Sequence, residues 1–156
     1  MKTCKAITVG AVEMLLDAKR HCDFCLEPAG DSPYRKSLAD SMAFGCVPIF
    51  FHPMTDNANE WLWGGWKEAS RVYVERGDYL KPQSEGGIIL SELIESCPPA
   101  LLQRYKATIM RYARRFQVSL FDDVEPPYDA VHMMLERAAE YAESQQLRPK
   151  RGRHES

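Results

Sequence analysis

The sequence has no long hydrophobic run and no strong excess of one sign of charge. No segment approaches the ~20 consecutive apolar residues that cross a bilayer, and the first residues lead into no apolar signal core. The 20 basic and 22 acidic residues give a formal net charge of −2, so the chain has no general attraction to nucleic acid or anionic lipid. We expect a soluble chain with no membrane segment and no nucleic-acid partner.

The C-terminal end carries the one strongly basic run of the chain. Its cations are interleaved with polar residues and a proline but with no aromatic side chain: Arg148, Lys150, Arg151 and Arg153. Sites for single-stranded nucleic acid combine cations with aromatic residues, so this composition favours a solvated tail. We predict one domain over residues 1–144 and a basic flexible tail over residues 145–156, since 156 residues make one ordinary domain.

Cysteine is present in an odd number, which excludes complete pairing within the chain. The five residues are Cys4, Cys22, Cys25, Cys46 and Cys97. Cys22 and Cys25 have the spacing of a zinc knuckle, but no second Cys/His pair follows at a usable distance. An apolar Cys25 on a buried strand is the favoured interpretation, and we predict no metal site.

The usual phosphate-binding sequences are absent as well. The chain contains neither Gly-x-x-x-x-Gly-Lys-Ser/Thr, which builds the ATP loop, nor Gly-x-Gly-x-x-Gly, which binds dinucleotides. An ATP-loop or dinucleotide-binding domain therefore loses support.

A strand, a helix and a second strand form the best-defined pattern that the sequence does contain. Residues 23–26 are a short apolar run that ends at a proline and a glycine, which indicates a brief buried strand. Residues 47–51 are almost wholly apolar, as in a parallel strand covered on both faces. Because a helix between them gives a right-handed βαβ unit, we predict an α/β fold with a parallel sheet.

The helix of this unit has a start signal and a stop signal. Ser32 is placed to cap it and Pro33 to occupy its first position, so we predict a helix from Ser32 to about Phe44. The expected buried positions recur every four residues, and a glycine stands where a left-handed C-terminal cap is needed: Tyr34, Leu38, Met42 and then Gly45.

Weaker patterns describe the other segments. Residues 9–18 predict an amphipathic helix with Val12, Leu15 and Leu16 inward, and residues 71–75 alternate like a strand. Helices are predicted over 88–96, 99–118 and 128–144, the last with an inward face of Val131, Met134, Leu135 and Ala138. A glycine-rich stretch with three tryptophans is predicted as loop: Trp61, Trp63 and Trp66.

The loop between the first strand and the helix is the candidate binding site. In an open α/β sheet, ligands bind at the carboxyl ends of the strands, where loops lead into helix N-termini that attract phosphate. Gly30 allows close backbone approach, Ser32 and Ser37 offer hydroxyl groups, and the Arg35 guanidinium can bind two phosphate oxygens.

A purely structural interpretation of the same loop is equally open. Ser32 could serve only as the helix cap, and Arg35 could pair only with Asp31 or Asp40.

The unbroken segment 24–51, FCLEPAGDSPYRKSLADSMAFGCVPIFF, resembles the hallmark of the exostosin family of glycosyltransferases. That hallmark can be written FCL-x-P-x-GD-(S/T)-x-x-R-(R/K)-x-x-(F)-D-(A/S)-(I/M)-x-x-G-C-(I/V)-P-V. The following His-Pro, the tryptophan-rich segment and the last helix also resemble the plant-like branch, so the similarity extends over roughly residues 4–142. The chain departs from the hallmark at Ala39, where an aromatic residue is usual, and at Phe44, where a small one is.

The resemblance implies an inverting transferase that moves a sugar from a UDP-sugar donor to a glycan acceptor. Such enzymes have two facing Rossmann-like domains, an arrangement called GT-B, and this chain is similar to the C-terminal, donor-binding one. The N-terminal domain would then be missing, and the parent protein would be anchored in the Golgi membrane by a segment upstream. The resemblance implies that Gly30, Asp31, Ser32 and Arg35 bind the diphosphate, with Arg35 offsetting the charge of the leaving UDP without a metal.

Two further residues could line the donor site. The resemblance suggests that Asp40 accepts hydrogen bonds from the ribose, although an ion pair with Arg35 or Lys36 is equally natural. His52 follows the second strand and could reach the cleft, but a histidine that only bonds backbone is favoured. The three tryptophans could stack on sugar or uracil, with packing slightly favoured over that role.

No catalytic base can be chosen from the sequence. An inverting displacement needs a group that deprotonates the acceptor hydroxyl, and the available acids offer no geometry for a choice: Glu27, Asp31, Asp56 and Glu60. Two alternatives to an enzyme domain therefore stay open. One is a non-catalytic nucleotide-sugar-binding or scaffold module from a truncated gene product, and the other is an unrelated α/β nucleotide-binding domain.

Overall fold

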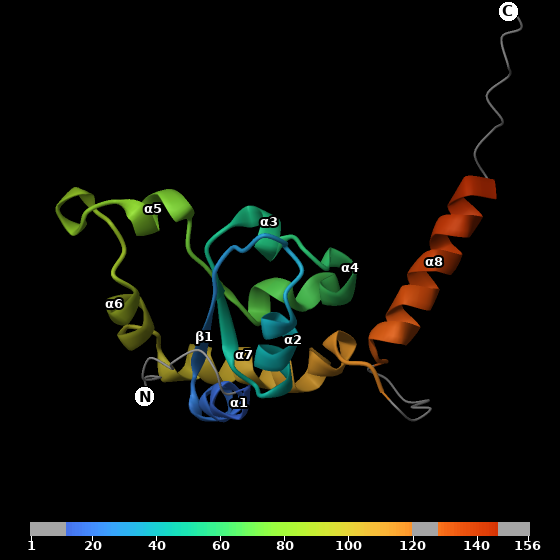
Figure 1. Cartoon of the computed structure of the whole chain (residues 1–156), viewed down its shortest axis with the longest axis horizontal. Coiled ribbons are helices and arrows are strands. Elements are labelled where there is room, and N and C mark those ends of the chain that lie inside the picture. Colours follow the sequence, from blue (N-terminus) through green and yellow to red (C-terminus); the bar gives the residue numbers. More distant parts are fainter. Residues whose placement is uncertain (1–11, 120–127, 147–156) are drawn as a thin grey trace, which may run out of the picture.

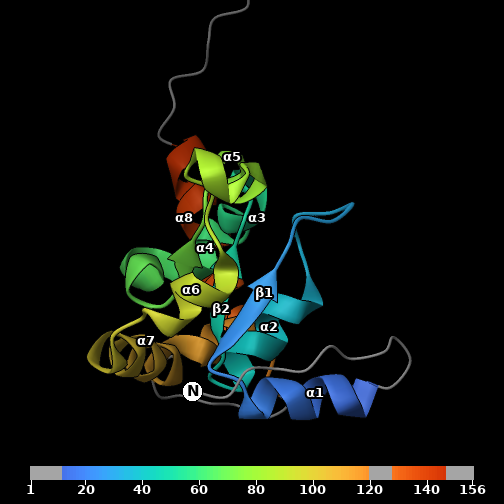
Figure 2. The same ribbon diagram turned by 90° about the vertical axis from the view of Figure 1, so that its left-hand side faces the viewer.

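The protein is a three-stranded parallel β-sheet with helices on both faces, in a computed structural model that describes residues 12–119 and 128–146 (Figure 1). The strands are β1 (Phe24–Glu27), β2 (Val47–Phe50) and β3 (Val72–Tyr73), in the order β1-β2-β3. Helices α1 (Val12–His21) and α2 (Lys36–Ala43) lie on one side of the sheet, and α6 (Leu90–Glu95) and α7 (Pro99–Tyr112) on the other (Figure 2). The predicted α/β fold with a Rossmann-like parallel sheet is confirmed.

Short helices connect these layers, and one long helix ends the described chain. They are α3 (Pro53–Asp56), α4 (Glu60–Trp63), η1 (Gly64–Ala69), α5 (Arg76–Leu80), η2 (Gln83–Glu85), η3 (Ala113–Phe116) and α8 (Ala130–Gln146). None of the described helices is long and apolar enough to span a bilayer.

The central strand β2 explains why the sheet is parallel and buried. All four of its residues are buried, because β1 and β3 flank it and helices cover both of its faces. Phe24 pairs with Val47, and Ile49 pairs with Val72, so all three strands run the same way. A parallel neighbour requires a crossover, and α2 provides it as predicted.

Helix α2 begins later than the sequence predicted. Its N-cap residue is Arg35, and the Ser32 hydroxyl instead accepts a hydrogen bond from the Tyr34 N–H at 3.2 Å within the loop. Tyr34 is 65% exposed, so its predicted inward position was wrong. The rest of the prediction is confirmed: Leu38 and Met42 are buried, and Gly45 has a left-handed φ of 68° just after the helix.

In α1, the inward position predicted for Leu15 was also wrong. Leu15 is 44% exposed and Leu16 is half-buried, whereas Lys19 is buried. A lysine can be buried here because its ammonium group meets the carboxylate of Glu27 on β1.

The tryptophan-rich segment is helix and core, not loop. Trp63 is fully buried and packs edge-on against Phe50 of β2 and Phe116 of η3, with ring centroids at 6.3 and 4.8 Å. Trp66 stacks on Tyr112 of α7 at 5.1 Å. The glycines suggested a loop, but Gly64 only marks the turn between α4 and η1, while the aromatic side chains bury a large apolar area.

The cysteines form disulfides rather than a zinc site. Cys25 of β1 is bonded to Cys46, which comes directly before β2, and Cys22 is disulfide-bonded as well. The interpretation of Cys25 as an apolar residue on a buried strand is confirmed, since it is 8% exposed on β1, and the disulfides exclude the zinc-knuckle alternative. Cys97 is a free thiol, and its burial, together with the nearby charge of Asp23, raises its pKa.

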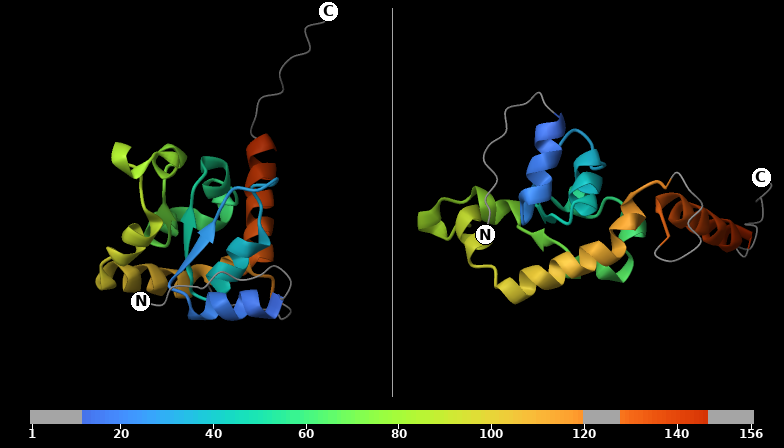
Figure 3. Two further views of the ribbon diagram at one scale, coloured as in Figure 1. Left: turned by 60° about the vertical axis from the view of Figure 1, so that its left-hand side comes forward. Right: turned by 90° about the horizontal axis from the view of Figure 1, so that it is seen from below.

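Helix α8 projects away from the sheet (Figure 3). Its first turn packs on the core through Ala130 and Met133, whereas the residues predicted to face inward are exposed: Val131, Met134, Leu135 and Ala138. Of the predicted tail, residues 145 and 146 belong to this helix, and residues 147–156 lie outside the described part of the chain.

The aromatic core gives a first testable expectation. Replacing Trp63 by alanine removes a fully buried ring, and we expect a loss of about 3–5 kcal/mol in the free energy of unfolding. Urea denaturation measures it, with Tyr34→Ala as an exposed aromatic control that should change stability by less than about 0.5 kcal/mol. Equal effects of the two substitutions would contradict the assigned core.

The stability that Asp129 contributes at the start of α8 should depend on pH. The backbone N–H groups of His132 and Ser119 donate to the Asp129 carboxylate and lower its pKa. A carboxylate whose pKa is lowered on folding stabilises the fold at pH values above its ordinary pKa of about 4. That contribution is lost as the pH falls through the lowered pKa.

Thermal unfolding of the wild type and of Asp129→Asn tests this dependence. We expect the advantage of the wild type near neutral pH to shrink steadily below about pH 4, because asparagine caps a helix without titrating. A difference that is independent of pH would show that the charge of Asp129 makes no contribution.

Candidate functional site

The candidate loop leaves the sheet at the carboxyl end of β1 and returns at the start of α2 (Figures 1 and 2). It comprises residues 28–35. The connection from β2 to α3 leaves the same end of the sheet, because the strands are parallel. This is the end at which ligands bind in open α/β sheets, as predicted.

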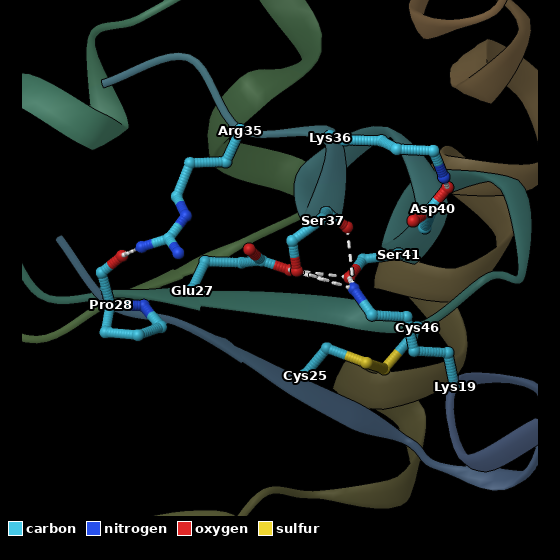
Figure 4. A network of polar contacts seen from close by, with 10 residues as sticks. All are labelled: Lys19, Cys25, Glu27, Pro28, Arg35, Lys36, Ser37, Asp40, Ser41 and Cys46. Carbon is cyan, nitrogen blue, oxygen red and sulfur yellow. Dashed lines mark hydrogen bonds and ion pairs between the residues drawn. A yellow bond between two sulfur atoms is a disulfide. The ribbon is translucent and has the colours of Figure 1, made fainter. Parts of the chain in front are cut away.

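The Arg35 side chain folds back across this loop. Its Nη1 donates a hydrogen bond to the Pro28 carbonyl at 3.0 Å, and the side chain remains exposed (Figure 4). Gly30 makes this arrangement feasible: a Cβ at this position would lie only 2.5 Å from Nη1. The guanidinium therefore packs against the backbone of its own loop, a contact that the sequence did not predict.

Arg35 makes no ion pair with any described residue. Asp40 is instead engaged by Lys36, with Nζ 2.5 Å from Oδ1 across one turn of α2. Asp31 and Ser32 are exposed on the loop. The interpretation in which Arg35 pairs only with Asp31 or Asp40 is therefore excluded. For Asp40, the surface ion pair that the sequence left open is present, and its partner is Lys36.

The Ser37 hydroxyl points away from the loop and into a buried polar network (Figure 4). It donates to Oε1 of Glu27 at 3.1 Å, and the Ser41 hydroxyl donates to the same oxygen at 2.6 Å. The Lys19 ammonium lies 3.3 Å from that oxygen and donates to both hydroxyls and to the Ser37 carbonyl. The Ser37 hydroxyl is thus already hydrogen-bonded to other side chains beneath the loop.

This network was not predicted, although the sequence contains a signal for it. Alternation along β1 places Glu27 on the same side as the buried Cys25, and a carboxylate on a buried side requires a partner. The partner could not be identified, because Lys19 comes from a different element. Lys19, Glu27 and Ser41 are 5%, 1% and 0% exposed, so the pair is held almost without water.

The remaining candidates occupy separate positions. His52 is half-buried and its Nδ1 accepts a hydrogen bond from the Met54 N–H at 3.1 Å, which caps α3 and agrees with the favoured backbone-bonding interpretation. Trp63 and Trp66 are buried in the core, so they are not available to stack on a ligand, and Trp61 is half-buried.

Three of the four candidate acids for a catalytic base are already paired. Glu27 is bonded to Lys19, and Asp56 and Glu60 both lie 3.1 Å from the Lys67 ammonium. Asp31 makes no ion pair with a described residue. The described residues contain no cluster of three or more potential metal ligands.

The fold and the loop define a Rossmann-like α/β domain with a candidate anion site at the carboxyl end of its sheet. The Exostosin GT47 domain model matches residues 4–84, just over half of the 156 residues, so the chain belongs to the exostosin GT47 family of glycosyltransferases. No solved structure matches the chain.

Three curated relatives from Arabidopsis thaliana show how far the similarity extends. The probable xyloglucan galactosyltransferase GT12 is 28% identical over 123 residues, which are 74% of this chain and 23% of the relative. The xyloglucan galactosyltransferase MUR3 is 63% identical over 30 residues, 19% of this chain and 5% of the relative. The xyloglucan-specific galacturonosyltransferase 1 is 49% identical over 41 residues, 26% of this chain and 6% of the relative.

The buried ion pair gives a prediction on stability. In Lys19→Met the Glu27 carboxylate stays buried without its counter-charge, so we expect a loss of about 3–5 kcal/mol in the free energy of unfolding. Lys81→Met is the matched control, because Lys81 pairs with Asp78 at a half-exposed site and should cost less than about 1 kcal/mol. Denaturant titration of both variants measures the difference, and a Lys19→Met loss no larger than that of the control would contradict burial of the pair.

Proposed function

We propose that this chain is the donor-binding part of a glycosyltransferase that transfers a sugar from a UDP-sugar to a glycan with inversion. The observation that carries the proposal is the exposed Arg35 guanidinium, which crosses a glycine loop at the carboxyl end of the sheet without an acidic partner among the described residues. The chain spans at most 23% of the three relatives described above, so a complete enzyme would need a further domain.

The loop suits a diphosphate for electrostatic reasons. A guanidinium forms two parallel hydrogen bonds to phosphate oxygens, and these charge-assisted bonds are about twice as strong as neutral ones. The first turn of α2, which begins at Lys36, adds backbone N–H groups and the positive end of the helix dipole. Binding would exchange the single hydrogen bond from Arg35 to Pro28 for stronger ones.

The same group would assist the reaction itself. In an inverting transfer, the acceptor oxygen attacks the anomeric carbon while the bond to the β-phosphate oxygen of UDP breaks, and a base takes the hydroxyl proton. Negative charge develops on the departing UDP, and Arg35 would stabilise it there without a metal. We assign no base among the described residues and propose that a further domain supplies it, together with the acceptor site.

The relatives indicate which donor to test first. Their names specify galactose or galacturonic acid as the sugar and xyloglucan as the acceptor polymer. UDP-galactose is therefore the first donor to try, with a polysaccharide as acceptor. The roles of Asp31 and Ser32 at the diphosphate, of Asp40 at the ribose and of His52 in the cleft are part of this proposal.

The disulfides support a secretory location. Cys25 and Cys46 are buried and bonded to one another, and such bonds persist in oxidising compartments rather than in the cytosol. We propose that the protein works in the Golgi, in polysaccharide biosynthesis.

Titration calorimetry with UDP tests the diphosphate site. We expect Arg35→Ala to weaken binding by about ten- to a hundred-fold, because hydrogen bonds to a charged group contribute about 1.5–3 kcal/mol each. Arg104→Ala is the control, since Arg104 is also an exposed arginine but lies on α7, away from the loop.

Three results would contradict the proposal: a wild-type chain without affinity for UDP, an unchanged affinity in Arg35→Ala, or equal losses in both variants. The first of these would favour a scaffold module instead.

A further inference from the structure

The buried network lies at the base of the candidate loop and joins its two ends. Glu27 immediately precedes the loop and Ser37 follows Arg35 by two positions, so the 3.1 Å hydrogen bond between their side chains encloses the loop, residues 28–35, together with Lys36. Ser41, one turn further along α2, donates to the same Glu27 oxygen at 2.6 Å. The end of β1 is therefore fastened to two successive turns of α2.

Lys19 fastens a third element at the same point. Its ammonium group donates to the Ser37 carbonyl at 2.6 Å, to the Ser37 hydroxyl at 2.9 Å and to the Ser41 hydroxyl at 2.6 Å, and it lies 3.3 Å from Glu27. An ammonium group has three protons to donate, and the partners from β1 and α2 surround it. Helix α1 is thereby tied to both ends of the loop.

These contacts are directional, unlike apolar packing. An apolar contact fixes a distance only loosely, whereas hydrogen bonds within a dry network fix both distance and angle. Buried ion pairs add little net stability compared with apolar pairs of the same volume, and their best-attested role is to specify one arrangement. Here the specified arrangement is the separation of the two loop ends, and hence the place of Arg35.

Because the charges within the network cancel, Arg35 has no competing negative charge beneath it. The charge of Glu27 is balanced by Lys19, so the carboxylate beneath the loop does not compete with a phosphate for Arg35. The guanidinium instead bonds only a neutral carbonyl, that of Pro28, among the described residues.

We infer that the buried Lys19–Glu27 pair is a positioning device for the loop, which holds residues 28–35 and the Arg35 guanidinium in the arrangement that receives a diphosphate. Neither side chain touches the ligand. This inference rests on the proposed function for the identity of the ligand, but the effect on the loop itself can be measured without any ligand.

The test replaces the pair by apolar residues of similar size, Lys19→Met with Glu27→Leu. The matched control is Lys106→Met with Asp23→Leu, which removes a second lysine–acid pair at the opposite end of β1. Three quantities are measured for each protein: the melting temperature, the affinity for UDP, and the amide hydrogen exchange of residues 29–35 without ligand.

We expect the Lys19/Glu27 variant to keep its melting temperature within a few degrees, because an apolar pair of similar volume commonly replaces a buried ion pair without loss. Its affinity for UDP should fall about ten-fold, the cost of ordering one or two side chains on binding, and its loop amides should exchange faster. The control variant should change neither the affinity for UDP nor the amide exchange of the loop. Unaltered affinity together with unaltered loop exchange would overturn the inference and leave the pair as a stabilising contact.

Two further outcomes also decide the question. If the wild type does not bind UDP, the proposed diphosphate site fails, and loop exchange alone then supports or overturns the positioning role. If the double variant does not fold, Ser41→Ala replaces it, since Ser41 is fully buried and bonds both Lys19 and Glu27. Faster loop exchange in Ser41→Ala supports the inference, and wild-type exchange overturns it.

Discussion

The parallel pairing of β1 with β2 is the constraint on which the other features of the molecule depend. Two parallel neighbours cannot be joined by a tight turn, so the chain must cross over through α2, and the connection from β1 into that helix must begin at the carboxyl end of the sheet. The Cys25–Cys46 disulfide holds the two strands together at one point, and the aromatic core around Trp63 packs against β2. The candidate loop is therefore presented by a rigid unit.

Charge is distributed unevenly across this unit. Beneath the loop a lysine and a glutamate cancel one another in a dry network, and on the outer face of α2 Lys36 is paired with Asp40. Arg35 belongs to neither pair and bonds a carbonyl oxygen. A cation that is exposed, close to a helix start and without an acidic partner in the described chain is poised for an anion, and this contrast between paired and unpaired charge underlies the proposed diphosphate site.

Much of the βαβ unit could be predicted, because its signals are local. The apolar runs of the two strands, the spacing of Leu38 and Met42, and the glycine after α2 each depend on neighbours in sequence. Contacts between distant segments could not be predicted in this way. The composition of the tryptophan-rich segment suggested a loop, but its side chains pack against α7 and η3, which come much later in the sequence.

The site itself was predicted only in outline, for the same reason. The sequence indicated the loop and Arg35, but not that Arg35 turns back over Gly30 or that Ser37 is used by Glu27 and Lys19. Helix α8 illustrates another limit: the periodicity shows which face is apolar, yet it does not show whether the described chain covers that face, and here Met134 and Leu135 stay exposed.

A crystal structure of the chain with UDP bound would show whether the loop receives a diphosphate. We expect diphosphate density over residues 28–35, with the Arg35 guanidinium released from the Pro28 carbonyl and within hydrogen-bond distance of a phosphate oxygen. Density at another place on the molecule, or an Arg35 side chain that keeps its bond to Pro28 while UDP is bound, would contradict this expectation.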